Sequence, residues 1–253
     1  LNSKEGIPYT KARSSRIIQE IVTLKNKYNI DGIYFNDENF ILNKKRIKEI
    51  AEAAIDLNLN MHFRGSGRCE LFLKFDDEYL KLFKKAGFYH FGLGVESGSN
   101  KTLRSINKQI TTGEIYSVVN KLVQYKFEAT YNFIAGFPHE TIDDYKETLR
   151  TIHDIFKKCT YMVYPIPAPS YFCPLPGTKS FDDAVKLGHK IPVTLTDWED
   201  VDYNISDMAW ISKDLHKFIT ESREVINEIN KKFIGEGAMI TQSDLAPLRK
   251  IMQ

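Results

Sequence analysis

Polar side chains, glycines and charged groups follow short apolar runs at several places along the chain. The blocks are residues 36–40 (NDENF), 64–68 (RGSGR), 92–99 (GLGVESGS) and 136–141 (GFPHET). Carboxylates and guanidinium groups bind charged ligands through charge-assisted hydrogen bonds, and glycines let the backbone approach a ligand closely. Such blocks could therefore bind and orient a charged small molecule.

Each block also has a structural explanation. Residues 36–39 could be a helix-capping turn, Glu96 could be a satisfied structural carboxylate, and Arg64 and Arg68 could form surface ion pairs of little energetic value. The glycines of residues 92–98 do not form a dinucleotide-binding fingerprint, because an acidic residue interrupts the turn. The order and spacing of the blocks are more specific than any single block.

The chain contains three cysteines, Cys69, Cys159 and Cys173, at widely separated positions. They exclude a disulfide framework and indicate a reducing, cytoplasmic compartment. Cys69 follows a strand end and is expected to be a buried, inert thiol. His139 and His153 have no partner at metal-ligand spacing and are interpreted as ordinary exposed histidines. We therefore assign no metal ligand and no catalytic residue from the sequence.

The elements that must position these blocks alternate between helices and strands. Apolar periodicity and capping signals predict helices over residues 14–28, 44–57, 76–86, 112–125 and 141–156. Ser14 or Ser15 could cap the first helix, and Thr141 with Asp144 has the spacing of a capping box. Strands are predicted over residues 33–35, 61–63, 89–95, 129–134 and 161–164, each preceded by a helix.

Apolar strands separated by helices are typical of βα units in a parallel sheet. A doubly wound sheet and a (β/α) barrel both satisfy this pattern. In either architecture, ligands bind beyond the carboxyl ends of the strands, which is where the polar blocks lie.

The sequence changes character after residue 164. Five prolines between residues 165 and 176 exclude a regular helix or a central strand there. A long amphipathic helix is predicted over residues 212–233, and the last twenty residues are expected to form a peripheral tail. We therefore divide the chain into residues 1–190, which contain the strands, and a C-terminal helical extension of residues 191–253.

The composition excludes several classes of protein. The 253 residues carry a net charge of +2, with 42% hydrophobic and 27% charged residues, as in a globular protein with a substantial core. No apolar run approaches the ~18 residues of a membrane-spanning helix, and the N-terminal residues lack the pattern of a signal peptide. The near-neutral charge gives no strong nucleic-acid signal. Because the chain begins with leucine, we expect it to be part of a longer protein.

Taken together, residues 14–184 resemble the radical S-adenosylmethionine (SAM) enzymes, in particular the branch of methylthiotransferases and cobalamin-binding members. The matching blocks, in order, are IYFNDENF at residues 33–40, Arg68, GVESGS at residues 94–99, Lys108, GFPHET at residues 136–141 and PGT at residues 176–178. This resemblance implies an α/β fold, a partial (β/α) barrel of the radical SAM type. The five predicted strands would be its second to sixth, with the first strand missing.

The resemblance also implies which residues bind SAM. Glu96 would accept hydrogen bonds from the ribose hydroxyls or the ammonium group, and Ser97 would add a neutral contact. Arg68 or Lys108 would pair with the SAM carboxylate.

Further cofactor contacts are implied on two other strands. The adenine contacts of the family fall on Asn132, Ala135 and Gly136, while Tyr34 and Asn36 would face the cofactor or the substrate. The chain departs from the family pattern in having asparagine at residue 132, where some members have glycine, and histidine at residue 139, where glycine is usual.

The family's chemistry requires a 4Fe–4S cluster held by a Cys-x3-Cys-x2-Cys loop, and this sequence has no such motif. The leading hypothesis is that the chain is the C-terminal part of a longer radical SAM enzyme, which would reductively cleave SAM at the cluster with electrons from a donor. Methylation, thiolation or rearrangement of a small-molecule, peptide or RNA substrate would follow, and any cobalamin domain would lie upstream.

Two alternatives stay open. One is a degenerate, cluster-free barrel that acts as a ligand-binding or protein-interaction module. The other is an unrelated barrel enzyme such as an aldolase, although the sequence offers no good lysine nucleophile or metal constellation for it.

Overall fold

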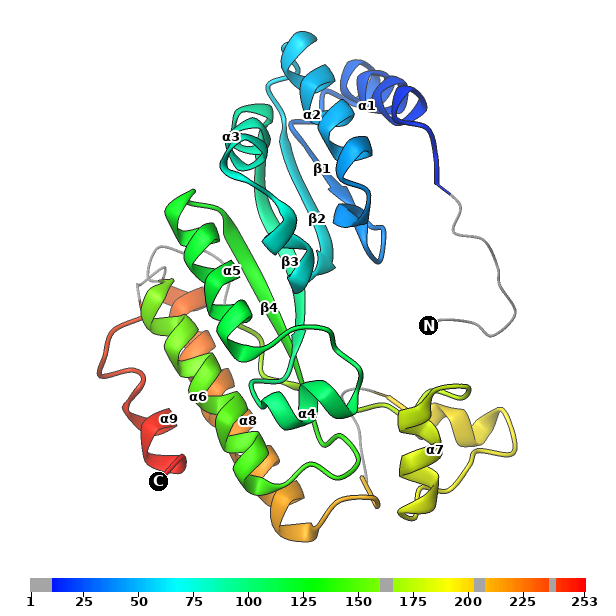
Figure 1. The fold of residues 1–253 in the computed structure, drawn as a ribbon, viewed down its shortest axis with the longest axis vertical. Helices are drawn as coiled ribbons and strands as arrows, with labels where there is room; N and C mark the ends of the chain where they lie inside the picture. The colour runs from blue at the N-terminus through cyan, green and yellow to red at the C-terminus, as the bar shows by residue number, and fades with distance from the viewer. Residues whose placement is uncertain (1–10, 160–165, 203–207, 237–239) are drawn as a thin grey trace. The chain divides into compact units, whose positions relative to one another are not determined.

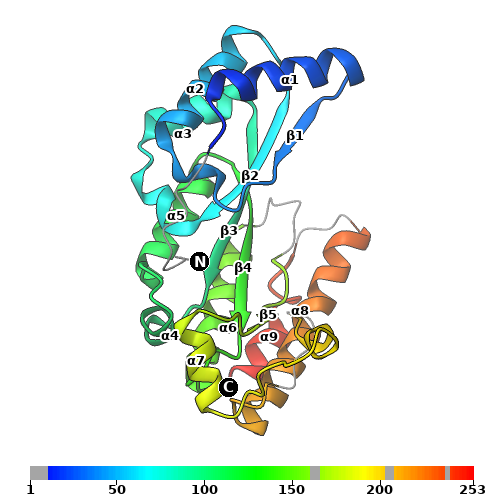
Figure 2. The same cartoon turned by 90° about the vertical axis from the view of Figure 1, so that its right-hand side faces the viewer.

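The strands form one sheet in sequential order. The structure is a computed structural model that describes residues 11–159, 166–202, 208–236 and 240–253. The sheet has the strand order β1-β2-β3-β4-β5, and the pairs β1–β2, β2–β3 and β4–β5 run parallel (Figure 1 labels β1 to β4, and Figure 2 labels β5). The predicted parallel α/β architecture is therefore confirmed.

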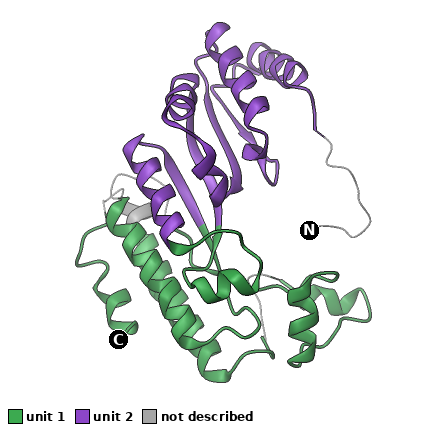
Figure 3. Ribbon diagram, viewed as in Figure 1, with its two compact units in different colours: residues 1–6, 95–112, 132–253 green, residues 7–94, 113–131 purple. Residues whose placement is uncertain are grey.

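The chain divides into two compact units (Figure 3). Within the described residues, unit 2 comprises 11–94 and 113–131, and unit 1 comprises 95–112 and 132–253. Strands β3 and β4 pass from one unit to the other, so the ends of both strands belong to unit 1.

Unit 2 contains the first βα units. Its elements are α1 (Ser14–Tyr28), β1 (Gly32–Phe35), α2 (Lys44–Asp56), β2 (His62–Arg68), α3 (Asp77–Ala86), most of α5 (Thr112–Gln124), and most of β3 (Phe88–Glu96) with the first half of β4 (Glu128–Ala135). Short 3-10 turns at Phe40–Leu42 and Cys69–Lys74 follow β1 and β2. Figure 2 shows α2, α3 and α5 on one side of these strands.

Alternate side chains of the strands point to the two faces of the sheet. Phe35, Phe63 and Phe88 are buried, and the ring of Phe35 stacks on that of Phe40 at 4.1 Å between centroids. The other face carries polar side chains, because Tyr34 pairs in register with Arg64. The aromatic core thus leaves one sheet face for polar groups.

Unit 1 contains α4 (Asn100–Ser105), α6 (Ile142–Lys158), β5 (Ser170–Tyr171), α7 (Lys179–Lys186), a 3-10 turn (Thr196–Asp200), α8 (Lys213–Glu236) and α9 (Ala246–Ile251). Helices α6, α8 and α9 contact one another and lie side by side (Figures 1 and 2). The Tyr145 hydroxyl lies 2.9 Å from Ser222 Oγ, which ties α6 to α8 inside this packed group.

Local signals predicted most helix boundaries. The capping box at the start of α6 is present, with Thr141 and Asp144 bonding each other's backbone N–H groups. Helix α3 has Asp76 as its N-cap and ends at Gly87, whose φ of +102° is the left-handed conformation favoured by glycine. The predicted cap of α1 is wrong: Arg13 is the N-cap, and the Ser14 hydroxyl bonds Glu49 instead.

Three other expectations have a different outcome. The strand predicted over residues 161–164 lies outside the described residues, and the fifth strand of the structure is β5. The last residues are not a peripheral tail, because Leu245 and Leu248 are buried where α9 packs on α6 and α8. His153 is buried rather than exposed, since it lies on the inner face of α6.

None of the helices in the described residues is both long and apolar enough to cross a bilayer.

Candidate functional site

Glu96 and Lys108 form an ion pair at the end of β3. Lys108 Nζ lies 3.0 Å from Glu96 Oε1, and the side chains of Lys108 and Glu96 are 8% and 23% exposed. The backbone of Glu96 has φ +70°, a left-handed conformation that is strained for a residue with a Cβ atom. Such strain is concentrated at functional sites. The structure therefore brings together two of the predicted SAM-binding residues.

The short helix α4 returns the chain from Glu96 to Lys108. Ser99 caps this helix by accepting a hydrogen bond from the Thr102 backbone N–H. Asn107 then takes a left-handed conformation with φ +53°, and the Lys108 N–H bonds the Leu103 carbonyl at 2.8 Å. This C-terminal turn directs the lysine back toward the strand end.

Ser97 fixes the turn after β3 against helix α6. Its side chain is fully buried, and its Oγ lies 3.0 Å from Thr148 Oγ1 and accepts the Ser99 N–H at 3.0 Å. The Gly98 N–H also bonds Thr148 Oγ1, at 2.9 Å. The hydroxyl of Ser97 therefore holds the backbone that carries Glu96, and its contact with SAM stays a prediction.

The end of β4 carries the other predicted residues of unit 1. Asn132 is exposed, whereas Ala135 is buried and its carbonyl accepts the Phe172 N–H at 2.8 Å. The Gly136 N–H donates to Glu140 Oε2 at 2.6 Å, and the Gly136 carbonyl accepts from Trp210 Nε1 at 2.7 Å. Both polar backbone groups of Gly136 thus already have a hydrogen-bond partner within the chain.

Glu140 is a buried carboxyl for which the sequence suggested no separate role. It is 7% exposed, and its Oε1 atom is buried without a hydrogen-bond partner among the described residues. Burial raises the pKa of Glu140 to about 8, although the hydrogen bonds from the Gly136 and Phe137 backbone act to lower it. Its only sequence signal was its place in the GFPHET block.

Asp144 connects α6 to α4. It accepts hydrogen bonds from Lys101 Nζ at 2.7 Å and Ser99 Oγ at 3.1 Å. Burial opposes its ionisation, but the hydrogen bonds from Lys101, Thr141 and Ser99 lower the pKa of this carboxyl overall. Asp144 is therefore a charged anchor, in contrast to the neutral acid expected for Glu140 at pH 7.

The remaining predicted residues, Tyr34, Asn36 and Arg68, belong to unit 2. Asn36 and Arg68 are exposed at the ends of β1 and β2, and Arg68 forms an ion pair with Glu70. The Tyr34 hydroxyl lies 3.2 Å from Ser66 Oγ on the neighbouring strand.

The described residues do not fit a 4Fe–4S cluster. They contain no group of three or more His, Cys, Asp or Glu side chains that could hold a metal. Cys69 and Cys159 are buried, as expected for Cys69, and Cys173 is half-buried with a pKa raised by burial and by Asp202. The donor set at the end of β3 does suit SAM, because a carboxylate and an ammonium group complement its ammonium and carboxylate.

The sequential parallel strands and the helices that connect them define a parallel α/β protein of the (β/α)-barrel class. A family model for the radical SAM superfamily matches residues 4–152. This chain therefore belongs to the radical SAM superfamily, as the sequence motifs predicted.

Curated relatives match most of this chain but less than half of their own. An uncharacterized methyltransferase of Pyrococcus horikoshii is 29% identical over 170 residues, 67% of this chain and 35% of the relative. A tRNA-2-methylthio-N(6)-dimethylallyladenosine synthase of Nitrosomonas europaea is 29% identical over 205 residues, 74% of this chain and 44% of the relative.

Solved structures confirm the fold. The apo form of the cobalamin-dependent SAM radical enzyme OxsB matches with a TM-score of 0.61 and 16% identity, covering 88% of this chain and 38% of that chain. Coproporphyrinogen III oxidase of Escherichia coli, a radical SAM enzyme, matches with a TM-score of 0.55 and 15% identity, covering 86% of this chain and 44% of that chain. The predicted radical SAM type of partial barrel is therefore confirmed.

Proposed function

We propose that this chain is the SAM-binding part of a radical SAM enzyme that, in its intact form, reductively cleaves SAM at a 4Fe–4S cluster. The observation that carries this proposal is the Glu96–Lys108 pair, which sits on strained backbone at the end of β3. When cleaved in this way, SAM supplies a carbon radical that abstracts hydrogen from an unactivated carbon.

The residues of this chain would bind and orient SAM. Lys108 engages Oε1 of Glu96, and Oε2 would accept hydrogen bonds from the ribose hydroxyls or the ammonium group. Lys108 would pair with the carboxylate, and the exposed amide of Asn132 would contact the adenine. Gly136 would add close backbone contact with the ring.

The cluster, the substrate and the electron donor of this proposal involve groups other than the residues of this chain. Cysteines outside this chain would hold the cluster, so we derive no step of the radical chemistry from its residues. The names of the relatives above support methylation, thiolation and an RNA substrate, and the likeness to cobalamin-dependent OxsB supports cobalamin as a further cofactor. Rearrangement and a small-molecule or peptide substrate are also part of the proposal. An electron donor and a reducing, cytoplasmic location complete the proposal.

Calorimetric titration of the chain with SAM tests the binding role. We expect Glu96→Gln and Lys108→Met each to weaken binding about tenfold, which corresponds to about 1.4 kcal/mol for one lost charge-assisted contact. Lys231→Met on the exposed face of α8 is the matched control and should leave SAM binding unchanged. Equal affinity of all variants would refute the assignment.

The absence of a cysteine triad from the sequence favours one alternative, a degenerate, cluster-free barrel that acts as a ligand-binding or protein-interaction module. Anaerobic cluster reconstitution, followed by iron and deoxyadenosine assays, separates the possibilities when the 253-residue chain is compared with a chain extended by the upstream coding sequence. Both proposals predict no stoichiometric cluster on this chain. Extending the chain with the upstream coding sequence should restore iron binding and SAM cleavage only if the first proposal is correct.

A further inference from the structure

A pocket lies in unit 2, at the beginnings of the strands rather than their carboxyl ends. It has a volume of about 480 Å³ and is lined by Asp31, Gly32, Ile33, Tyr34, His62, Arg64 and Tyr89. Its residues come from the loop before β1, from β1 itself, and from the first halves of β2 and β3. Volumes of this size hold small organic ligands.

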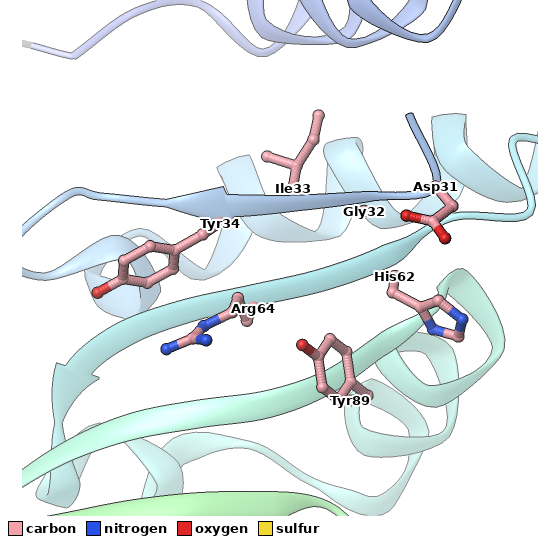
Figure 4. Close-up of a pocket in the computed structure, with 7 residues that line it drawn as sticks. All are labelled: Asp31, Gly32, Ile33, Tyr34, His62, Arg64 and Tyr89. Atoms are coloured by element: carbon pink, nitrogen blue, oxygen red, sulfur yellow. The ribbon is translucent and has the colours of Figure 1, made fainter. Parts of the chain in front are cut away.

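Three aromatic rings line this pocket. Tyr34 is 48% exposed, an unusual state for a large aromatic side chain in a strand. The rings of His62 and Tyr89 meet edge to face at 5.6 Å between centroids. Figure 4 shows Tyr34, Arg64 and Tyr89 on one side of the sheet, with Ile33 pointing away from them. The rings therefore offer flat apolar surface to a ligand instead of filling the core.

Arg64 supplies positive charge among these rings. Its guanidinium carbon lies over the Tyr34 ring, 4.4 Å from the ring centroid. The neighbouring His90 stays neutral at pH 7, because burial and then the charge of Arg64 lower its pKa to about 4. Among the described residues that line the pocket, Arg64 supplies the positive charge at this end, whereas Asp31 lies at the other end, near His62 (Figure 4).

We propose that this pocket binds a small planar aromatic molecule that carries a carboxylate or a phosphate. The ring of the ligand packs against Tyr34 and Tyr89, and its anionic group pairs with Arg64. An aliphatic anion would leave the rings uncovered, and a neutral aromatic ring would make no use of the guanidinium charge. Asp31 opposes a second anionic group at the far end and can accept a hydrogen bond from a ring N–H. This site goes beyond the proposed SAM-binding function and uses none of the SAM donors of unit 1.

Paired probes test both features of the ligand. Titrations followed by calorimetry use indole-3-acetate against indole-3-acetamide for the carboxylate, and adenosine monophosphate against adenosine for the phosphate. We expect at least one anionic probe to bind tenfold or more tightly than its neutral partner, and that pair identifies the head group. Similar affinity within both pairs, or no binding of any probe at millimolar concentration, would overturn the proposal.

Variants then assign the binding to this pocket. Arg64→Met should abolish the preference for the anionic probe, and Arg64→Lys should retain part of it. Arg16→Met on helix α1 removes the same charge from an exposed position and is the control, which should keep the preference. Tyr34→Leu should weaken both members of a pair severalfold, whereas Tyr34→Phe should not. An unchanged anion preference in a folded Arg64→Met variant would refute the site.

The SAM site is distinguished by two further measurements. Glu96→Gln should leave binding of the aromatic anion unchanged, and excess SAM should not displace it. Displacement by SAM together with loss of binding in Glu96→Gln would place the probe in the SAM site and overturn this inference, while leaving the proposed function intact.

Discussion

Lys108 Nζ donates to Glu96 Oε1 across 3.0 Å and joins the end of β3 to the segment that follows helix α4. Both side chains are largely removed from solvent, at 8% exposure for Lys108 and 23% for Glu96. A largely desolvated pair of this kind is less screened by salt than an exposed one. The pair therefore fixes the position of the Glu96 carboxylate.

A double-mutant cycle measures this coupling. We expect Glu96→Gln and Lys108→Met, singly and together, to give a coupling free energy of about 1 kcal/mol or more in urea unfolding. The surface pair Arg16–Glu20, 73% and 58% exposed, is the control and should give less. Equal coupling in the two cycles would show that burial does not strengthen the Glu96–Lys108 pair.

Residue 139 has a left-handed backbone conformation, so the histidine at this position lowers the stability of the chain relative to the glycine that is usual in the family. His139 has φ +67° and an exposed side chain, so its Cβ strains the turn before α6. We expect His139→Gly to raise the free energy of unfolding by roughly 0.5 kcal/mol, because strain relief exceeds the added entropy of the unfolded chain. His139→Ala keeps the Cβ and should bring no gain; a gain of the same size would contradict the backbone argument.

Gly98 is required by close packing against α6. A Cβ atom there would lie 2.4 Å from Thr151 Oγ1 and 2.7 Å from the Glu147 carbonyl oxygen, and a helix backbone cannot move aside easily. Gly98→Ala should therefore lower the free energy of unfolding by about 2 kcal/mol. Gly113→Ala in α5 is the matched control, since no described atom lies within 4 Å of the position that its Cβ would take, and its stability should be unchanged or raised.

The buried Glu140 predicts a pH-dependent stability. Its pKa is raised from 4.5 to about 8 in the folded chain, so the unfolded chain binds fewer protons between these pH values. The free energy of unfolding of the wild-type chain should therefore fall as pH rises from about 4.5 to about 8, and then level off. The slope is at most about 1.4 kcal/mol per pH unit.

Glu140→Gln keeps an oxygen for the Gly136 N–H and removes the ionisation. Thermal unfolding should show the variant gaining on the wild-type chain steadily from pH 5 to pH 8. Parallel pH profiles of the two proteins would mean that Glu140 is already ionised in the folded chain.

The longer helices and the first four strands could be predicted because their signals are local, whereas the short helices α4, α7 and α9 were not predicted. The capping box of Thr141 and Asp144, and the glycine at the end of α3, act within one helical turn. The resemblance of the polar blocks to a known family likewise pointed to Glu96 and Lys108, because motif order is itself a property of the sequence.

Contacts between distant segments were decided only by the tertiary structure. Strand β5 has two residues, too few for any periodicity, and it forms by pairing with β4. Ser97 became a structural hydroxyl because Thr148, 51 residues away, lies against it. The burial of Glu140 and the stacking of Arg64 on Tyr34 likewise require neighbouring elements to be in place. The sequence by itself thus determined the family, the longer helices and the first four strands. The tertiary structure decided which polar side chains are buried and which have hydrogen-bond partners, because both depend on the packing of segments that are distant in the sequence.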